Sequence, residues 1–148
     1  GLELAQTGMV VTLDVGNIKN VHPSKKREVG ERLSNLALKN DYGINKSAES
    51  PSYKNHKVVN DTLIIIFDYA ELGLVFKNSS KYGFEIAGVN KEFYSAEAKI
   101  KHNNLVWLSS RFVKKPKYAR YAWSDTSSAT LFNSEGLPAS SFTTEPNY

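Results

Sequence analysis

The chain has 148 residues, of which 41% are hydrophobic, and a formal net charge of +4. This length supports the core of one globular domain, or of one domain with part of another. The absence of cysteine excludes disulfides, a thiolate nucleophile and cysteine-ligated metal sites. An excess of 19 basic over 15 acidic residues is too small to predict a nucleic-acid partner. No apolar run approaches the roughly 20 residues that cross a bilayer, so we expect no membrane partner either.

The N-terminal part has the pattern of a buried strand followed by a helix. Residues 8–14 (GMVVTLD) are apolar and β-branched and end in an acid, as a strand inside an α/β sheet would. Pro23 suits a first helical turn, and an apolar stripe then predicts a helix that ends near residues 41–43. The stripe consists of Val29, Leu33, Leu36 and Ala37. One strand and one helix cannot close such a sheet, so its partner strands must lie elsewhere.

A polar stretch, residues 45–52 with Pro51 in it, reads as a linker, and short strands follow it. Residues 62–68 are apolar on both faces, which is typical of a central sandwich strand. Further expected elements are a hairpin of residues 96–101 and 105–108 that turns at Asn103 and Asn104, a strand at 119–123, and an irregular tail after 136–138. We therefore predict an α+β fold: the closing strand and helix of an α/β domain in residues 1–45, then an antiparallel β-sandwich-like domain in residues 46–148.

The chemistry concentrates in the loop between the predicted strand and helix, where His22 precedes Pro23. Loops at the carboxyl ends of strands are where α/β enzymes gather catalytic groups, and a histidine there suits a general base. The alternative is that His22 only starts the helix and packs on the strand. From the spacing alone, both interpretations stay open.

Three separated blocks resemble the sialate O-acetylesterases, a branch of the SGNH/GDSL hydrolases. The first consists of residues 8–16, the Val-His-Pro run at 21–23 and the helical residues 28–33. The second is Gly83 to Gly88, and the third comprises residues 120–125, 131–133 and 135–140. Because the blocks occur in order over nearly the whole chain, together they are more specific than any one of them.

The resemblance implies serine-type hydrolysis of O-acetyl esters on sialic acid, with His22 as the general base. In such enzymes the nucleophilic serine and the oxyanion hole come from N-terminal blocks that this sequence does not contain. No serine here lies in a Gly-x-Ser-x-Gly or Gly-Asp-Ser motif, and Ser134 has the setting of a turn residue. We therefore expect this chain alone to be inactive and its partners to be an O-acetylated sialic acid or related acetylated glycan and a segment carrying the serine. The family also implies a secreted or periplasmic location.

The acid that orients His22 departs from the common Asp-x-x-His pattern. Lys19 lies three residues before His22, and Asn17 and Asn20 stand where related sequences often have aspartate. Asp14 is the best carboxylate nearby, and we name it as the candidate orienting acid. Asp14 could instead cap the loop by accepting hydrogen bonds from backbone amides, and we favour this role over the orienting role. A backbone carbonyl could then orient the histidine.

The remaining polar and aromatic residues favour structural interpretations. His56 and His102 lack the spacing of zinc ligands, so we predict no metal and no cofactor. The basic loop around Pro116 is expected to be solvated. The aromatic residues Tyr118, Tyr121 and Trp123 share strand spacing, which favours the core over stacking on a sugar.

A different class of function remains: a non-catalytic β-sandwich module that binds carbohydrate or packs on an enzyme. The strand and helix at the start favour the esterase, because a free-standing binding module does not need them. Without its sheet the apolar stripe of the helix would be exposed, and we expect that exposure to favour a homo-oligomer.

Overall fold

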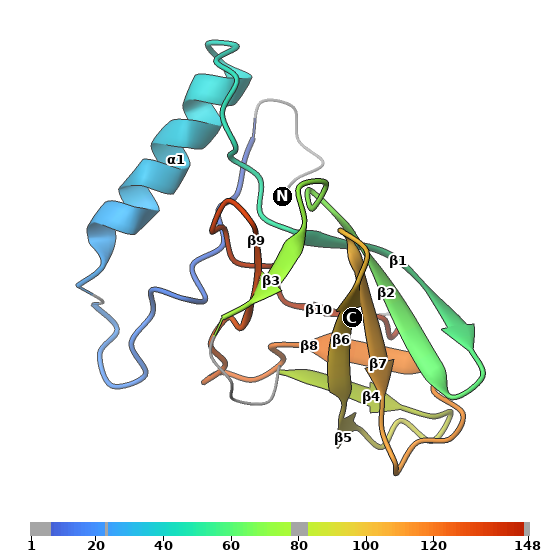
Figure 1. The fold of residues 1–148 in the computed structure, drawn as a ribbon. Coiled ribbons are helices and arrows are strands. Elements are labelled where there is room, and N and C mark those ends of the chain that lie inside the picture. Colours follow the sequence, from blue (N-terminus) through green and yellow to red (C-terminus); the bar gives the residue numbers. More distant parts are fainter. Residues whose placement is uncertain (1–6, 23, 78–82, 147–148) are drawn as a thin grey trace.

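The computed structural model describes residues 7–22, 24–77 and 83–146. In these residues the chain forms one helix, α1 (Lys26–Asn40), and is otherwise mostly β, with two four-stranded antiparallel sheets and a two-stranded ladder. Figure 1 shows α1 standing to one side of the strands. No helix in the described part of the chain is both long and apolar enough to span a membrane.

The first sheet has the strand order β1-β2-β7-β6, and all its neighbours are antiparallel. Its strands are β1 (Ser52–Val59), β2 (Thr62–Asp68), β6 (Glu97–Lys101) and β7 (Leu105–Ser109). The two-faced apolar run of β2 is explained by its central place, where four of its seven residues are buried. The predicted central strand and the predicted hairpin of β6 and β7 are both confirmed.

The second sheet has the order β10-β8-β4-β5, and a separate ladder joins β3 to β9. The sheet consists of β4 (Phe84–Ala87), β5 (Tyr94–Ser95), β8 (Tyr118–Tyr121) and β10 (Phe142–Thr143). The ladder consists of β3 (Leu74–Phe76) and β9 (Leu131–Asn133). The prediction of an irregular tail is wrong at β10, which pairs with β8 and places Phe142 in the core. A strand of two residues is too short to show an alternating pattern in the sequence. It forms because it pairs with β8.

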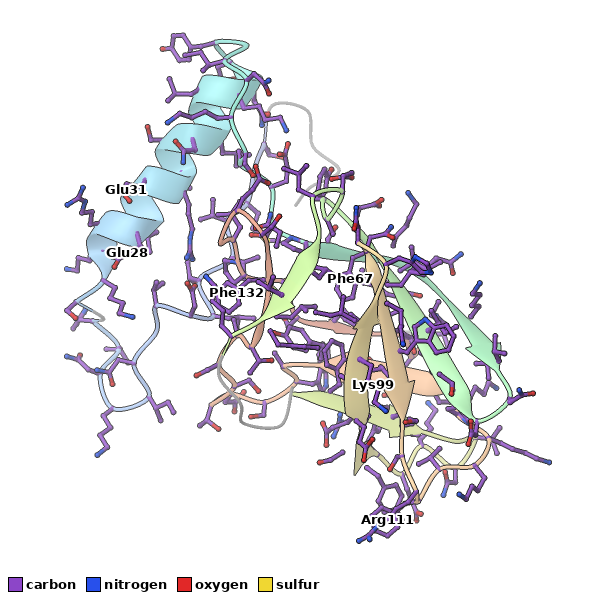
Figure 2. The ribbon with its side chains drawn as sticks, in the orientation of Figure 1. Glu28, Glu31, Phe67, Lys99, Arg111 and Phe132 are labelled. Carbon is purple, nitrogen blue, oxygen red and sulfur yellow. The ribbon has the colours of Figure 1, made fainter. Side chains whose placement is uncertain are left out.

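The hydrophobic core draws on both four-stranded sheets, as a sandwich-like arrangement requires. Leu63, Ile65 and Phe67 of β2 belong to the same buried cluster as residues of the second sheet. Phe67 and Phe142 pack edge to face with ring centroids 5.9 Å apart. Figure 2 shows Phe67 among the strands, well away from Glu28 and Glu31 on α1. Tyr121 is fully buried, and its hydroxyl accepts hydrogen bonds from the backbone N–H groups of Thr130 and Leu131, each at 2.9 Å.

Trp123 does not share the core face of Tyr121, so this part of the predicted strand is wrong. The strand β8 stops at Tyr121 because Ala122 adopts a left-handed conformation with φ of 48°. The Ala122 N–H donates to the carbonyl of Gly83 at 2.9 Å, which holds this turn in place. As a result Tyr118 and Tyr121 are core residues, as predicted, whereas Trp123 is 38% exposed.

Residues 8–14 form no strand in this structure, which corrects the expected closing strand within this chain. They run as an irregular segment with a turn at residues 13–15. A strand needs a neighbour to pair its backbone groups, and none of the described strands pairs with this segment. Val11 and Val15 are nevertheless buried.

The helix forms as expected, but two of the four residues of its apolar stripe are exposed in the described chain. It begins at Lys26, and Pro23 lies outside the described residues. Leu36 is buried and lies so close to Gly8 that a Cβ atom there would collide with it. Leu33 is 49% exposed and Ala37 is exposed as well. The helix thus has the pattern of one that covers a sheet, but the described residues place no sheet against Leu33 and Ala37.

The stretch expected to be a linker is attached to the β strands. Pro51 and Ala48 are buried, and the Glu49 carboxylate pairs with Lys39 of α1 at 2.5 Å. The Ser47 hydroxyl donates to Glu135 at 2.5 Å. These contacts connect the helix to the strands through the stretch itself.

Candidate functional site

The segment that leads to His22 is held by a bidentate ion pair between Asp14 and Arg32 of α1. Arg32 Nη1 and Nη2 donate to the two carboxylate oxygens of Asp14 at 2.7 and 2.5 Å. Arg32 Nη1 also donates to the carbonyl of Val11 at 2.7 Å. The two charged side chains are only 11% and 19% exposed, so water weakens this pair less than one on the surface.

The same segment is attached to the β strands on its other side. Leu13 packs against the hydrophobic core, and its carbonyl accepts a hydrogen bond from the N–H of Ala129 at 3.3 Å. The N–H of Val15 closes a turn on the Thr12 carbonyl at 3.1 Å. Residues 11–15 are therefore fixed between α1 and the strands, and the loop that follows starts from a defined point.

His22 lies on an exposed loop that is organised by asparagine side chains. Asn17 Oδ1 accepts from the N–H of Lys19, and Asn20 Oδ1 accepts from the N–H of His22, both at 2.9 Å. Each is a local turn in which the side chain takes a backbone donor. The sequence shows these two asparagines in places where aspartate was expected, and the structure gives them a role in shaping the loop.

The imidazole of His22 is exposed and has no hydrogen bond or ion pair with any described residue. Asp14 and His22 belong to one loop, but within the described chain the contacts of the Asp14 carboxylate are with Arg32. Neither the expected contact with His22 nor a bond from a backbone amide to Asp14 is present among these contacts. An exposed histidine can exchange protons with a bound molecule, but it needs a partner to fix its ring.

Arg32 is the residue that sequence reasoning missed at this site. It lies on the helix, 18 residues from Asp14 in sequence, within the block at residues 28–33 that resembles the esterase family. A local pattern carries no information on a pair at that separation. An arginine among the apolar positions of a helix, opposite a strand-end acid, is the one sequence signal that could have suggested it.

The other candidate residues lie apart from this loop and have structural roles. The hydroxyl of Tyr53 is 2.7 Å from His56 Nδ1, and burial lowers the pKa of His56 below its ordinary value. Ser134 lies in a turn, as predicted, and donates to the carbonyl of Leu72 at 3.0 Å. Among the residues that the structure describes, no three His, Asp or Glu side chains lie close enough together to hold a metal ion.

No family model and no curated protein matches the chain. Among solved structures, the fold and part of the sequence match a carbohydrate acetylesterase, and the chain is related to this class of enzyme. The matching structure is that of XAC1771 from Xanthomonas citri, with a TM-score of 0.90 and 33% sequence identity. The match covers 98% of this chain but 34% of that one, so the chain spans about a third of the length of the acetylesterase.

Proposed function

We propose that this chain is the C-terminal part of a carbohydrate esterase that removes O-acetyl groups from sialic acids by serine-type acyl transfer. The observation that carries the proposal is the relation of almost the whole chain to about a third of a carbohydrate acetylesterase. In this proposal residues 1–45 complete an SGNH-type α/β domain, and residues 46–148 are a β-rich C-terminal domain. The enzyme works outside the cell or in the periplasm.

In the proposed reaction His22 is the general base and the nucleophilic serine lies on a segment that this sequence does not contain. The serine oxygen attacks the acetyl carbonyl while the imidazole of His22 takes its proton. The imidazole then gives that proton to the sugar oxygen as the sugar leaves, and an acetyl-serine remains. Water, deprotonated by the same imidazole, releases acetate and restores the serine. The exposure of His22 on an ordered loop supports this assignment, since the ring is free to meet a serine from outside the chain.

The second part of the proposal is that Asp14 orients the imidazole of His22. An ionised carboxylate has about four lone-pair sites, so it can serve Arg32 and an imidazole at the same time. The two hydrogen bonds from Arg32 hold the Asp14 carboxylate at a fixed place at the base of the loop. Docking of the missing segment would have to bring the ring of His22 to the carboxylate.

The exposed apolar side chains near His22 support a surface for that missing segment. Ile18 is 72% exposed, Val21 is 89% exposed and Leu33 of α1 is 49% exposed. Residues 8–14 have strand-forming composition and pair with none of the described strands, which suits pairing with a sheet supplied from elsewhere. When that segment is absent, we propose that copies of the chain cover these side chains by forming a homo-oligomer.

The test is hydrolysis of 9-O-acetylated N-acetylneuraminic acid by three samples: the chain alone, the chain mixed with the upstream portion of its parent, and the whole parent. We expect activity in the mixture and the parent only, and a loss of at least about 10³-fold in kcat with His22→Ala. The matched control is His102→Ala, a histidine in an exposed turn, which should keep full activity. Asp14→Asn should lower kcat less than His22→Ala if Asp14 orients the imidazole.

Two results would overturn the proposal. An active chain without any upstream portion would place the nucleophile inside these 148 residues. An active mixture that is indifferent to His22→Ala would remove the histidine from the reaction.

A further inference from the structure

A pocket of about 620 Å³ lies in the β region, apart from the His22 loop. It is lined by residues from β4, β5, β6 and β7 and by the turn after β8, so its walls come from both four-stranded sheets and from the turn that starts at Ala122. Pockets that hold small molecules usually measure about 300 to 1,000 Å³. The size and the mixed walls therefore fit a small polar ligand.

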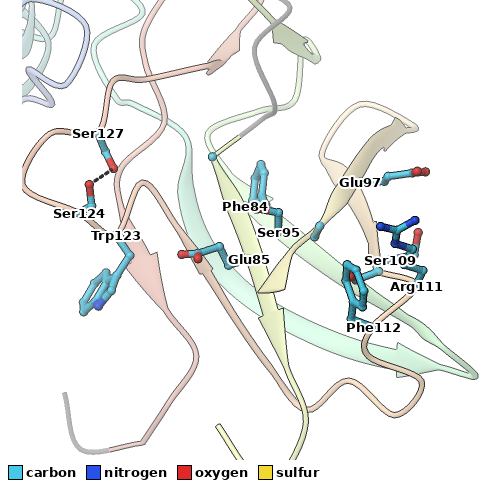
Figure 3. A pocket seen from close by; sticks show the side chains of 13 residues that line it. Phe84, Glu85, Ser95, Glu97, Ser109, Arg111, Phe112, Trp123, Ser124 and Ser127 are labelled. Carbon is cyan, nitrogen blue, oxygen red and sulfur yellow. Dashed lines mark hydrogen bonds between the residues drawn. The ribbon is translucent and has the colours of Figure 1, made fainter. Parts of the chain in front are cut away.

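Aromatic rings stand on two sides of this pocket. Trp123 is 38% exposed, and Phe112 is 60% exposed although it stacks on Tyr94 with ring centroids 5.4 Å apart. Figure 3 shows Trp123 on one side, Phe112 with Arg111 on the other, and Glu85 between them. The face of an aromatic ring carries partial negative charge, and the C–H groups of a sugar ring can pack on it.

The charges of the pocket balance. Glu85 pairs with Arg120 at 2.7 Å, and Arg111 lies over the ring of Phe112 with its Cζ atom 4.6 Å from the ring centroid. The two remaining charged groups of the lining, Arg111 and Glu97, have opposite signs. A ligand with a net negative charge would find no surplus of positive charge here, whereas a neutral polar ligand pays no such penalty.

Hydroxyl groups supply the remaining polar contacts of the lining. Ser124 and Ser127 belong to the turn after Trp123, and the hydroxyl of Ser127 donates to that of Ser124 at 3.2 Å. Ser95 and Ser109 line the other walls. A serine hydroxyl can both donate and accept, so such a set can exchange hydrogen bonds with the hydroxyls of a sugar.

We propose that this pocket binds a neutral saccharide, with Trp123 as the stacking platform and Glu85 and the turn serines as hydrogen-bonding groups. The site is separate from the esterase proposal, because it needs neither His22 nor the missing serine. In a whole enzyme it would hold a part of the glycan other than the acetylated sugar. A chain without any esterase role would still have this site.

The experiment titrates the 148-residue chain with neutral tetrasaccharides of glucose, mannose or galactose, and with N-acetylneuraminic acid as the anionic comparison. Binding is followed by calorimetry. We expect at least one neutral tetrasaccharide to bind with a dissociation constant of about 1 mM or lower. Trp123→Ala should weaken that binding by about 10-fold or more, and His22→Ala should leave it unchanged.

Trp107→Ala is the matched control for the tryptophan. Trp107 is also 38% exposed, but it lies on β7 opposite Lys99 of β6 and does not line the pocket. Its substitution should leave binding within about twofold. Phe112→Ala tests the second aromatic wall of the pocket and should weaken binding as well. Because Phe112 is 60% exposed, this test does not depend on whether Trp123→Ala folds.

Three results would overturn the proposal. The folded chain, checked by its near-ultraviolet circular dichroism, would bind none of the neutral saccharides. Alternatively, Trp123→Ala and Trp107→Ala would weaken binding equally, or N-acetylneuraminic acid would bind tighter than every neutral sugar. The esterase test measures hydrolysis and its dependence on His22, whereas this test measures saccharide binding and its dependence on Trp123. Failure of the esterase proposal is therefore distinguishable from failure of the saccharide proposal.

Discussion

The N-terminal arm, residues 7–22 and 24–44, and the β region, residues 52–77 and 83–146, are stabilised in different ways. The β region contains nearly all of the hydrophobic core, to which the described arm adds only the partly buried Leu13. In the described arm the buried apolar residues are Val11, Val15 and Leu36. Its other attachments are polar, above all the pair of Asp14 with Arg32.

The two regions obtain their free energy of folding from different sources. Apolar burial between two sheets can stabilise the β region with the chain's own residues. The arm holds its shape through a few directional bonds, while several of its large apolar side chains face solvent. Such a segment has the properties of one that completes its packing on another surface.

The largest expected effect tests whether the core of the β region is self-sufficient. Phe84→Ala removes a ring that is 2% exposed and should lower the free energy of unfolding by about 3 to 5 kcal/mol. The measurement is urea denaturation followed by circular dichroism. The control is Phe112→Ala, which removes a ring that is 60% exposed and should change the same free energy by no more than about 0.5 kcal/mol. Equal losses would mean that the core does not dominate stability.

The second effect should be confined to the arm. Arg32→Ala leaves the Asp14 carboxylate, 19% exposed, without its partner, and this should cost about 1 to 3 kcal/mol of local stability. Hydrogen exchange of backbone amides in residues 11–22 should then rise by about 10-fold or more, with the strands unchanged. Arg27→Ala breaks an exposed pair with Glu31 on the same helix and should leave exchange as it is. An equal rise across the strands would contradict the division into two regions.

The smallest effect concerns pH and the edge of the β region. Burial lowers the pKa of His56 in the folded chain, so the unfolded chain binds the proton more readily. The stability contributed by neutral His56 is therefore complete above about pH 6.5 and is lost as the pH falls through the lowered pKa. His56→Gln should make the fall in urea midpoint between pH 7.5 and 5.5 measurably smaller, by up to about 0.5 M.

The comparison variant for pH is His102→Gln, at an exposed turn residue. It should keep the full fall in midpoint of the unmodified chain. If both variants behave alike, His56 does not account for the pH dependence.

Sequence patterns were sufficient where an element depends on its own residues. The run at 62–68 and the alternation at 96–101 predicted β2 and the hairpin of β6 and β7, because the face of each residue follows from the pleat of the strand. They failed where an element depends on a distant partner. Residues 8–14 have the composition of a strand, but without a neighbouring strand they stay irregular.

At the candidate site the sequence located His22 and Asp14 but not their surroundings. The pair of Asp14 with Arg32 joins residues that no period relates, and the pocket beside Trp123 arises because a single alanine turns the chain. Alanine is a poor marker of a left-handed position, where glycine or asparagine would have indicated a turn. The alternating pattern at 119–123 therefore predicted Trp123 as a core residue, although the strand ends at Tyr121.

The turn at Ala122 separates two kinds of selection on neighbouring residues. Tyr121 is constrained by the packing of the interior, whereas Trp123 is partly exposed and lines the pocket. A substitution at position 123, in evolution or in an engineered variant, therefore changes the wall of the pocket without replacing a side chain of the buried core cluster. A lineage of such proteins could diversify what this face touches at little cost in folding.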